Sequence, residues 1–153
     1  MVRIYPTAGL FALTALMFTH AAPTRRQLGN LECNIDRGEI VFHVAQLGAT
    51  VSSLGNATGL VAANSSTDAD IQAMQSGATG AGGAIKQILL ALINGDNADP
   101  SLRDQVGGNL TMVLTALSDL NSTDPTASAL LAQANTQLVN AVLAGNGVVN
   151  NCK

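Results

Sequence analysis

The sequence predicts an all-α protein, an antiparallel up-and-down four-helix bundle with one disulfide joining the start of helix 1 to the end of helix 4. The first observation is a set of apolar stripes whose members recur in steps of three and four residues, the spacing of one helix face. The second is the cysteine pair, because Cys33 opens the first stripe and Cys152 closes the last. In an up-and-down bundle these positions lie at the same end, where a disulfide can close.

The first helix is expected over residues 31–54, and Gly55 with Asn56 supplies the stop signal. Its core stripe consists of Cys33, Ile40, Val44, Leu47, Val51 and Leu54. The outer face carries three carboxylates and His43, an order typical of a solvated helix surface. No metal site is expected there, because a Glu-x-x-His step and a second helix of ligands are both missing.

A second apolar line lies on the first helix opposite its core stripe. It contains Ile35, Phe42, Ala45 and Ala49. Two alternatives are open for this line. Either the segment 57–66 folds back and covers it, or the line is exposed, in which case Ile35 and Phe42 are candidate contacts for a surface or ligand.

The second helix is expected to begin near Thr67 and to end at Asn94-Gly95. Its core stripe consists of Ile71, Met74, Ala78, Ala81, Ile85, Ile88 and Leu92. The glycine-rich segment 77–83 in its middle is no phosphate loop, because it lacks the Gly-Lys-Ser/Thr ending. It predicts either a kink or close packing against a neighbouring helix, and we favour close packing.

The third and fourth helices are expected to start at Asp99-Pro100 and Asp124-Pro125, where an acidic cap precedes a proline in the first turn. The third stripe is Leu102, Val106, Leu110, Val113, Leu117 and Leu120. The fourth is Ala127, Leu131, Ala134, Leu138, Ala141, Gly145, Val148 and Cys152. No strand-like alternation competes with these helical patterns.

The first 26 residues have the pattern of a secretory leader. Residues 1–22 predict a signal peptide, residues 23–26 a short propeptide ending in the dibasic pair Arg25-Arg26, and residues 27–153 a single helical domain. We therefore expect a secreted, extracellular protein, and the cell wall is one place where it could be retained. No transmembrane segment is expected, because no later run reaches about 20 uninterrupted apolar residues.

Composition limits the classes of partner. Of seven Lys and Arg, Arg3, Arg25 and Arg26 would be lost on processing while all ten acids remain, which leaves a net charge of −6. Such a surface repels phosphate backbones, so nucleic acid is not an expected partner. Phe42 would be the only aromatic residue left, so the aromatic platforms used for carbohydrates and bases are missing.

Four Asn-x-Ser/Thr sequons predict N-glycosylation of a secreted chain. They lie at Asn56, Asn64, Asn109 and Asn121. We expect at least two to carry sugar. We expect no enzymatic activity and no cofactor, because His43 stands alone as a base and the acids fall mostly at helix ends and outer faces.

Signal peptide, dibasic site, sequons and amphipathic helices rich in Ala, Leu, Ser, Thr and Asn together resemble the small secreted helical proteins of fungi. The pattern is similar to the hydrophobic surface-binding and cell-wall galactomannoprotein family over residues 31–152, although that family typically lacks the terminal cysteine pair. The resemblance implies binding to a hydrophobic surface, a cell-wall component or a lipid. The alternative is a secreted effector or signalling protein that acts on a specific protein partner.

Overall fold

The computed structural model describes residues 31–152, and this part of the chain is all-helical with four helices. The elements are α1 (Leu31–Leu54), β1 (Leu60–Ala62), α2 (Thr67–Asn94), α3 (Ser101–Asp119), β2 (Leu120–Ser122) and α4 (Pro125–Asn151). Cys33 and Cys152 form a disulfide with their Cα atoms 5.0 Å apart. The predicted helical class and disulfide are thus confirmed. The predicted signal peptide and propeptide lie outside the described residues.

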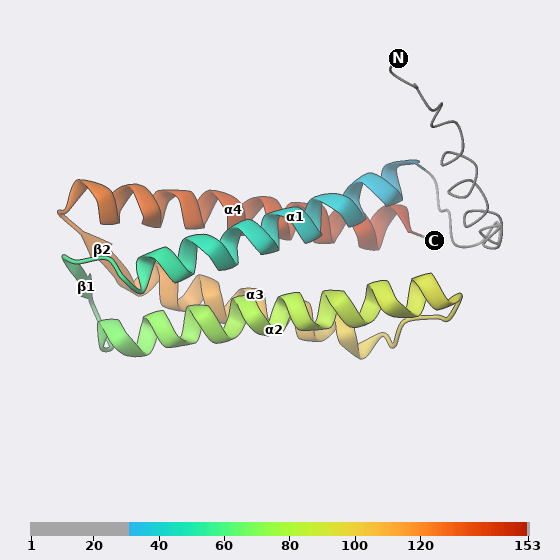
Figure 1. The fold of residues 1–153 in the computed structure, drawn as a ribbon, viewed down its shortest axis with the longest axis horizontal. Helices are drawn as coiled ribbons and strands as arrows, with labels where there is room; N and C mark the ends of the chain where they lie inside the picture. Colours follow the sequence, from blue (N-terminus) through green and yellow to red (C-terminus); the bar gives the residue numbers. More distant parts are fainter. Residues whose placement is uncertain (1–30, 153) are drawn as a thin grey trace, which may run out of the picture.

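The four helices associate as two pairs. α1 packs along α4 and α2 packs along α3, whereas the contacts of α1 with α2 and of α3 with α4 are much less extensive. The start of α1, the loop between α2 and α3, and the end of α4 lie at one end of the molecule, here called the disulfide end (Figure 1). The two strands lie at the opposite end, here called the strand end (Figure 1).

The helix boundaries follow from local capping chemistry. The Ser66 hydroxyl accepts a hydrogen bond from the Ala69 N–H at the start of α2, and Asp124 does the same for Ala127 at the start of α4. α2 ends at Gly95, whose φ of 85° is in the left-handed region that favours glycine. The Gly95 stop and the Asp124 cap are as predicted from the sequence.

The helical patterns did not indicate the two short strands. β1 pairs with β2 in antiparallel register, with Val61 opposite Asn121. Each strand has three residues, which is too short to show the alternation by which a strand is recognised in a sequence.

Asp119, the last residue of α3, holds the segment between β1 and α2 in place. Its carboxylate accepts hydrogen bonds from the backbone N–H groups of Asn64 and Ser65, each at 3.0 Å. The bond from the Asn64 N–H is the main reason why the pKa of the Asp119 carboxyl lies below its usual value.

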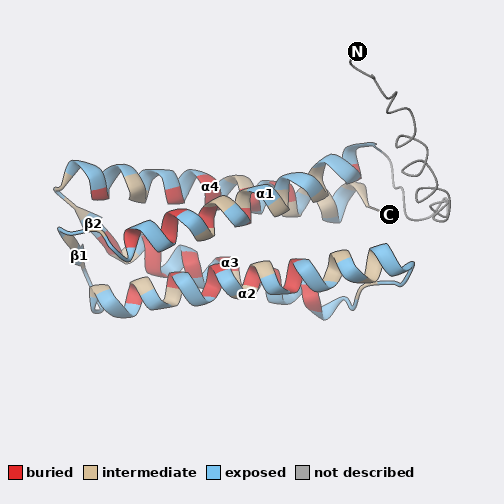
Figure 2. Ribbon diagram, in the orientation of Figure 1, coloured by how far each residue is buried: buried red, intermediate tan, exposed pale blue. Residues whose placement is uncertain are grey.

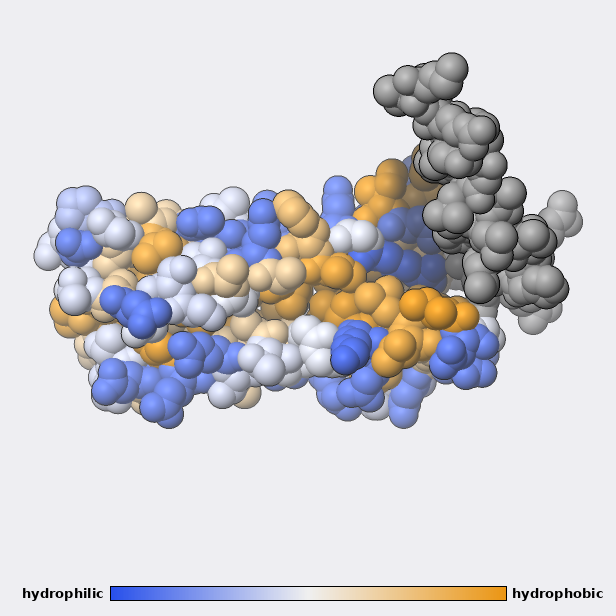
Figure 3. Space-filling view, in the orientation of Figure 1, coloured by the Kyte–Doolittle hydropathy of each residue, from blue (hydrophilic) through white to orange (hydrophobic). Residues whose placement is uncertain are grey.

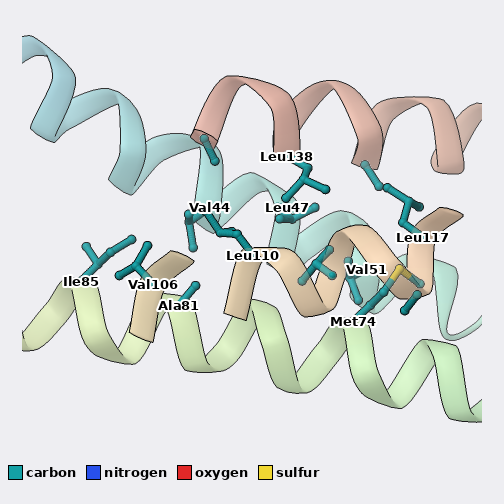
Figure 4. Close-up of a cluster of buried hydrophobic side chains, with 14 of the residues drawn as sticks. Val44, Leu47, Val51, Met74, Ala81, Ile85, Val106, Leu110, Leu117 and Leu138 are labelled. Carbon is teal, nitrogen blue, oxygen red and sulfur yellow. The ribbon is translucent and has the colours of Figure 1, made fainter. Parts of the chain in front are cut away.

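The hydrophobic core lies where the predicted stripes of the four helices meet, and it is aliphatic. Figure 4 shows side chains from all four helices converging there. The largest fully buried members are Leu47, Val51, Leu54, Met74, Val113 and Leu138. Figure 2 shows that the buried residues are concentrated on the facing sides of the helices.

Two glycines of α2 allow α3 to approach closely. A Cβ atom at Gly77 would lie 2.7 Å from the backbone oxygen of Asn109, and one at Gly80 would meet the Asn109 side chain. A Cβ at Gly82 or Gly83 would meet nothing within 4 Å. Close packing, the favoured alternative for this segment, is therefore confirmed for the first two glycines and does not explain the other two.

Candidate ligand cleft

An apolar cleft of about 840 Å³ lies between the two helix pairs, toward the disulfide end. All four helices and the loop between α2 and α3 contribute to its wall. Representative apolar members are Ile40, Ile88, Leu92, Leu110, Leu138 and Val148. The volume falls within the range of about 300–1,000 Å³ typical of small-molecule sites.

The cleft arises from a gradient of burial along the predicted core stripes. On α2, Met74 is fully buried, but Ile88 and Leu92 on the same face are only half-buried. On α4, Leu138 is buried, whereas Val148 is half-buried. The helix faces are as predicted, but on α2 and α4 the stripe residues toward the disulfide end stay partly exposed. Ile88, Leu92 and Val148 line the cleft there.

Large apolar side chains also stand exposed at the rim of the cleft. Leu114 of α3 is 50% exposed, and Val142 and Leu143 of α4 are 44% and 62% exposed. On the face seen in Figure 3, hydrophobic residues gather over α2 and the side of α1 that faces it, in the half nearer the disulfide end. Burial of such side chains against an apolar ligand would be favourable.

The polar side chains of the cleft are concentrated at the disulfide end. Arg37 lies in the second turn of α1 and Arg103 in the first turn of α3, with Asn97 in the loop before α3 and Asn146 near the end of α4. The lining contains no aspartate or glutamate. The cleft therefore combines a long apolar wall with two arginines toward one end.

The predicted contact residues lie outside this cleft. Ile35 is 47% exposed and Phe42 is 56% exposed on α1, and neither lines the cleft wall. The alternative in which the segment 57–66 covers them is wrong, because residues 60–62 of that segment pair with β2 instead. The Phe42 ring contacts only one other ring, that of His43, edge to face at 5.3 Å, among residues 31–152.

His43 is less solvated than predicted. Its side chain is half-buried, and its Nδ1 atom is buried without a hydrogen-bond partner among residues 31–152. Asp36 of the same helix accepts a hydrogen bond of 2.8 Å from the Asn151 amide of α4. Within the described residues, no cluster of three or more His, Cys, Asp or Glu side chains could hold a metal ion.

The four sequons differ in their surroundings. Asn56, Asn64 and Asn121 are exposed near the strand end, although the Asn64 amide donates to Asp119. Asn109 is half-buried in α3 against Gly80, and its amide donates to the Gln105 carbonyl at 2.7 Å. A sugar on Asn109 would have to replace these contacts. Occupancy of the sequons stays a prediction, and the exposed sites suit it better.

Comparison with known proteins adds no assignment, since no family model, curated protein or solved structure matches the chain. One helix of the described chain, α2, is by length and composition alone apolar enough to cross a membrane. In the structure α2 packs along α3 and contributes Met74 and Ala81 to the core.

Proposed function

We propose that this protein binds the apolar chain of a lipid in the cleft between the α1/α4 and α2/α3 pairs, and that it is not an enzyme. The observation that carries the proposal is the open cleft itself, about 840 Å³ and lined by aliphatic side chains of all four helices. An aliphatic wall without aromatic platforms suits a flexible hydrocarbon chain better than a ring-shaped ligand.

The energetic argument rests on surface that the fold leaves uncovered. Each methylene group buried contributes about 0.8 kcal/mol, so a chain of several methylenes has enough driving force to bind in such a cleft. The half-buried Ile88, Leu92 and Val148 gain burial when a chain lies against them. The exposed Leu114 and Leu143 at the rim gain it as well.

We also propose how the four helices are oriented and where the protein acts. The four helices run as an antiparallel up-and-down bundle, and the protein is secreted and N-glycosylated, with a fungal cell surface as its proposed location. A disulfide is typical of an oxidising compartment, which supports secretion. The exposed sequons near the strand end would leave the cleft at the other end free of sugar.

Two adjacent glycines of α3 offer a matched test. Gly107 lines the cleft and Gly108 does not, and a Cβ at either position would meet nothing within 4 Å. Gly107→Phe is expected to occupy part of the cleft and Gly108→Phe to add a ring at the surface. Displacing about two methylenes of a bound chain costs about 1.6 kcal/mol, or a little over tenfold in affinity.

The measurement is titration with an uncharged dye whose emission rises in apolar surroundings, followed by its displacement with dodecanol. We expect binding by the unmodified chain and by Gly108→Phe, and affinity about tenfold weaker for Gly107→Phe. Equal affinities for the two variants would place the bound chain outside the cleft. If neither the dye nor dodecanol binds, the lipid proposal is wrong and the alternative of an effector acting on a protein partner is favoured.

A further inference from the structure

We infer that the cleft selects single-chain lipids with an anionic head group and holds that head group at the disulfide end, beside Arg103. This inference rests on the proposed function and adds the charge and the orientation of the ligand. The shared chemistry is one negatively charged group on one hydrocarbon chain, whether the charge is a carboxylate or a phosphate.

The distribution of charge carries the first step. Acids outnumber bases among residues 31–152, where Arg37, Lys86 and Arg103 are the only Lys and Arg. Two of these three cations line the cleft, and no carboxylate does. A chain that is acidic in general therefore presents two arginines and no carboxylate to a ligand in this cleft, which is the charge complementarity that an anionic head group needs.

The surroundings of Arg103 carry the second step. Its side chain is exposed, and no hydrogen bond or ion pair holds its guanidinium within the described residues. The nearby acid Asp99 accepts a hydrogen bond from the Ser101 N–H, and Asp36 of α1 accepts one from Asn151. The guanidinium offers a planar fork of N–H donors that matches both carboxylate and phosphate.

The orientation follows from where the polar and apolar parts of the wall lie. Arg37, Asn97, Arg103 and Asn146 are all near the disulfide end. From Arg103 the wall of α3 continues through Val106 to Leu110, which lies among the buried core residues in Figure 4. A ligand with its head at Arg103 directs its chain along this wall toward the middle of the molecule.

The test compares ligands of equal chain length and variants of equal charge change. The probes are dodecanoate, dodecyl phosphate, dodecanol and dodecyltrimethylammonium, below their micelle concentrations, with acetate and inorganic phosphate as chainless controls. The variants are Arg103→Met and Lys86→Met, because Lys86 is an exposed cation of α2 outside the cleft. Affinity is measured by displacement of the uncharged dye at low and high salt.

We expect both anions to bind about fivefold more tightly than dodecanol, and the cation more weakly. Arg103→Met should remove this preference while dodecanol still binds, whereas Lys86→Met should keep it. Added salt should reduce the preference. If only dodecanoate binds more tightly than dodecanol, the head group is a carboxylate. If only dodecyl phosphate does, the head group is a phosphate.

Equal binding of dodecanol and both anions would overturn the inference and leave the proposed function intact. Binding of none of the chain-bearing probes would overturn both. Binding of acetate or inorganic phosphate as tightly as dodecanoate would overturn the proposal of a lipid ligand and show a simple anion site.

Discussion

The close approach of α2 and α3 makes a sharp prediction about two glycines of one helix. Gly77→Ala places a methyl group 2.7 Å from the Asn109 backbone oxygen and 2.8 Å from Cγ2 of Val113. Overpacking against backbone costs about 3 kcal/mol, and the better helix propensity of alanine returns about 1 kcal/mol. The net loss should be about 2 kcal/mol. Gly83→Ala meets nothing within 4 Å and should instead stabilise the fold by about 1 kcal/mol.

The assay is urea denaturation followed by far-ultraviolet circular dichroism. The two variants should shift the midpoint in opposite directions with unchanged slope, because neither changes the area exposed on unfolding. The difference of about 3 kcal/mol between them exceeds the uncertainty of the extrapolation. If Gly77→Ala proves as stable as Gly83→Ala, α2 and α3 are not in such close contact, and the tight packing of this helix pair is wrong.

Three further predictions concern the disulfide, the strand end and Phe42. Replacing Cys33 and Cys152 together by serine should cost about 4–5 kcal/mol by the loop-entropy estimate, and two free thiols in the unreduced, unfolded protein would disprove the bond. The Asp119 carboxyl has a lowered pKa, so its hydrogen bonds stabilise the fold above the ordinary value of 3.8 and are lost as pH falls through the folded pKa. Asp119→Asn should flatten the fall in the denaturation midpoint below pH 4, and an unchanged pH profile would contradict this role. Phe42→Ala should weaken adsorption to apolar beads while the melting temperature changes little, since the ring is 56% exposed, whereas a large fall in melting temperature would show a structural role.

The helices could be predicted from the sequence because their ends are set by neighbouring residues. Ser66 before α2, Gly95 after it and Asp124 before Pro125 each act within a few positions of the chain. The apolar stripes could be predicted for the same reason. Their three-to-four residue spacing is visible within one helix and shows which face of that helix is apolar. The disulfide followed once the two stripes were assigned, because the start of α1 and the end of α4 lie at the same end of the molecule, where Cys33 and Cys152 meet.

The cleft could not be predicted in the same way. Helical periodicity says that Ile88 and Leu92 belong to an apolar face, but it does not say how far the opposite helix pair lies from them. The separation of the pairs is a tertiary property. The close packing at Gly77 and Gly80 does not set it, because both glycines meet α3, the partner of α2 within the same pair. Arg103 was overlooked for the same reason, because only the structure places it beside the cleft.

The chain connections explain why the cleft lies at the disulfide end. The disulfide joins α1 to α4, and the loop at this end joins α2 to α3, so each of these links lies within one helix pair. The two segments that connect one pair to the other, 55–66 and 120–124, lie at the strand end (Figure 1), where β1 and β2 are hydrogen-bonded. Within the described residues, every covalent link between the pairs is therefore at the strand end. A ligand can separate the two helix pairs at the disulfide end without breaking the disulfide or the strand pairing. The distance by which the pairs must move apart decreases toward the strand end.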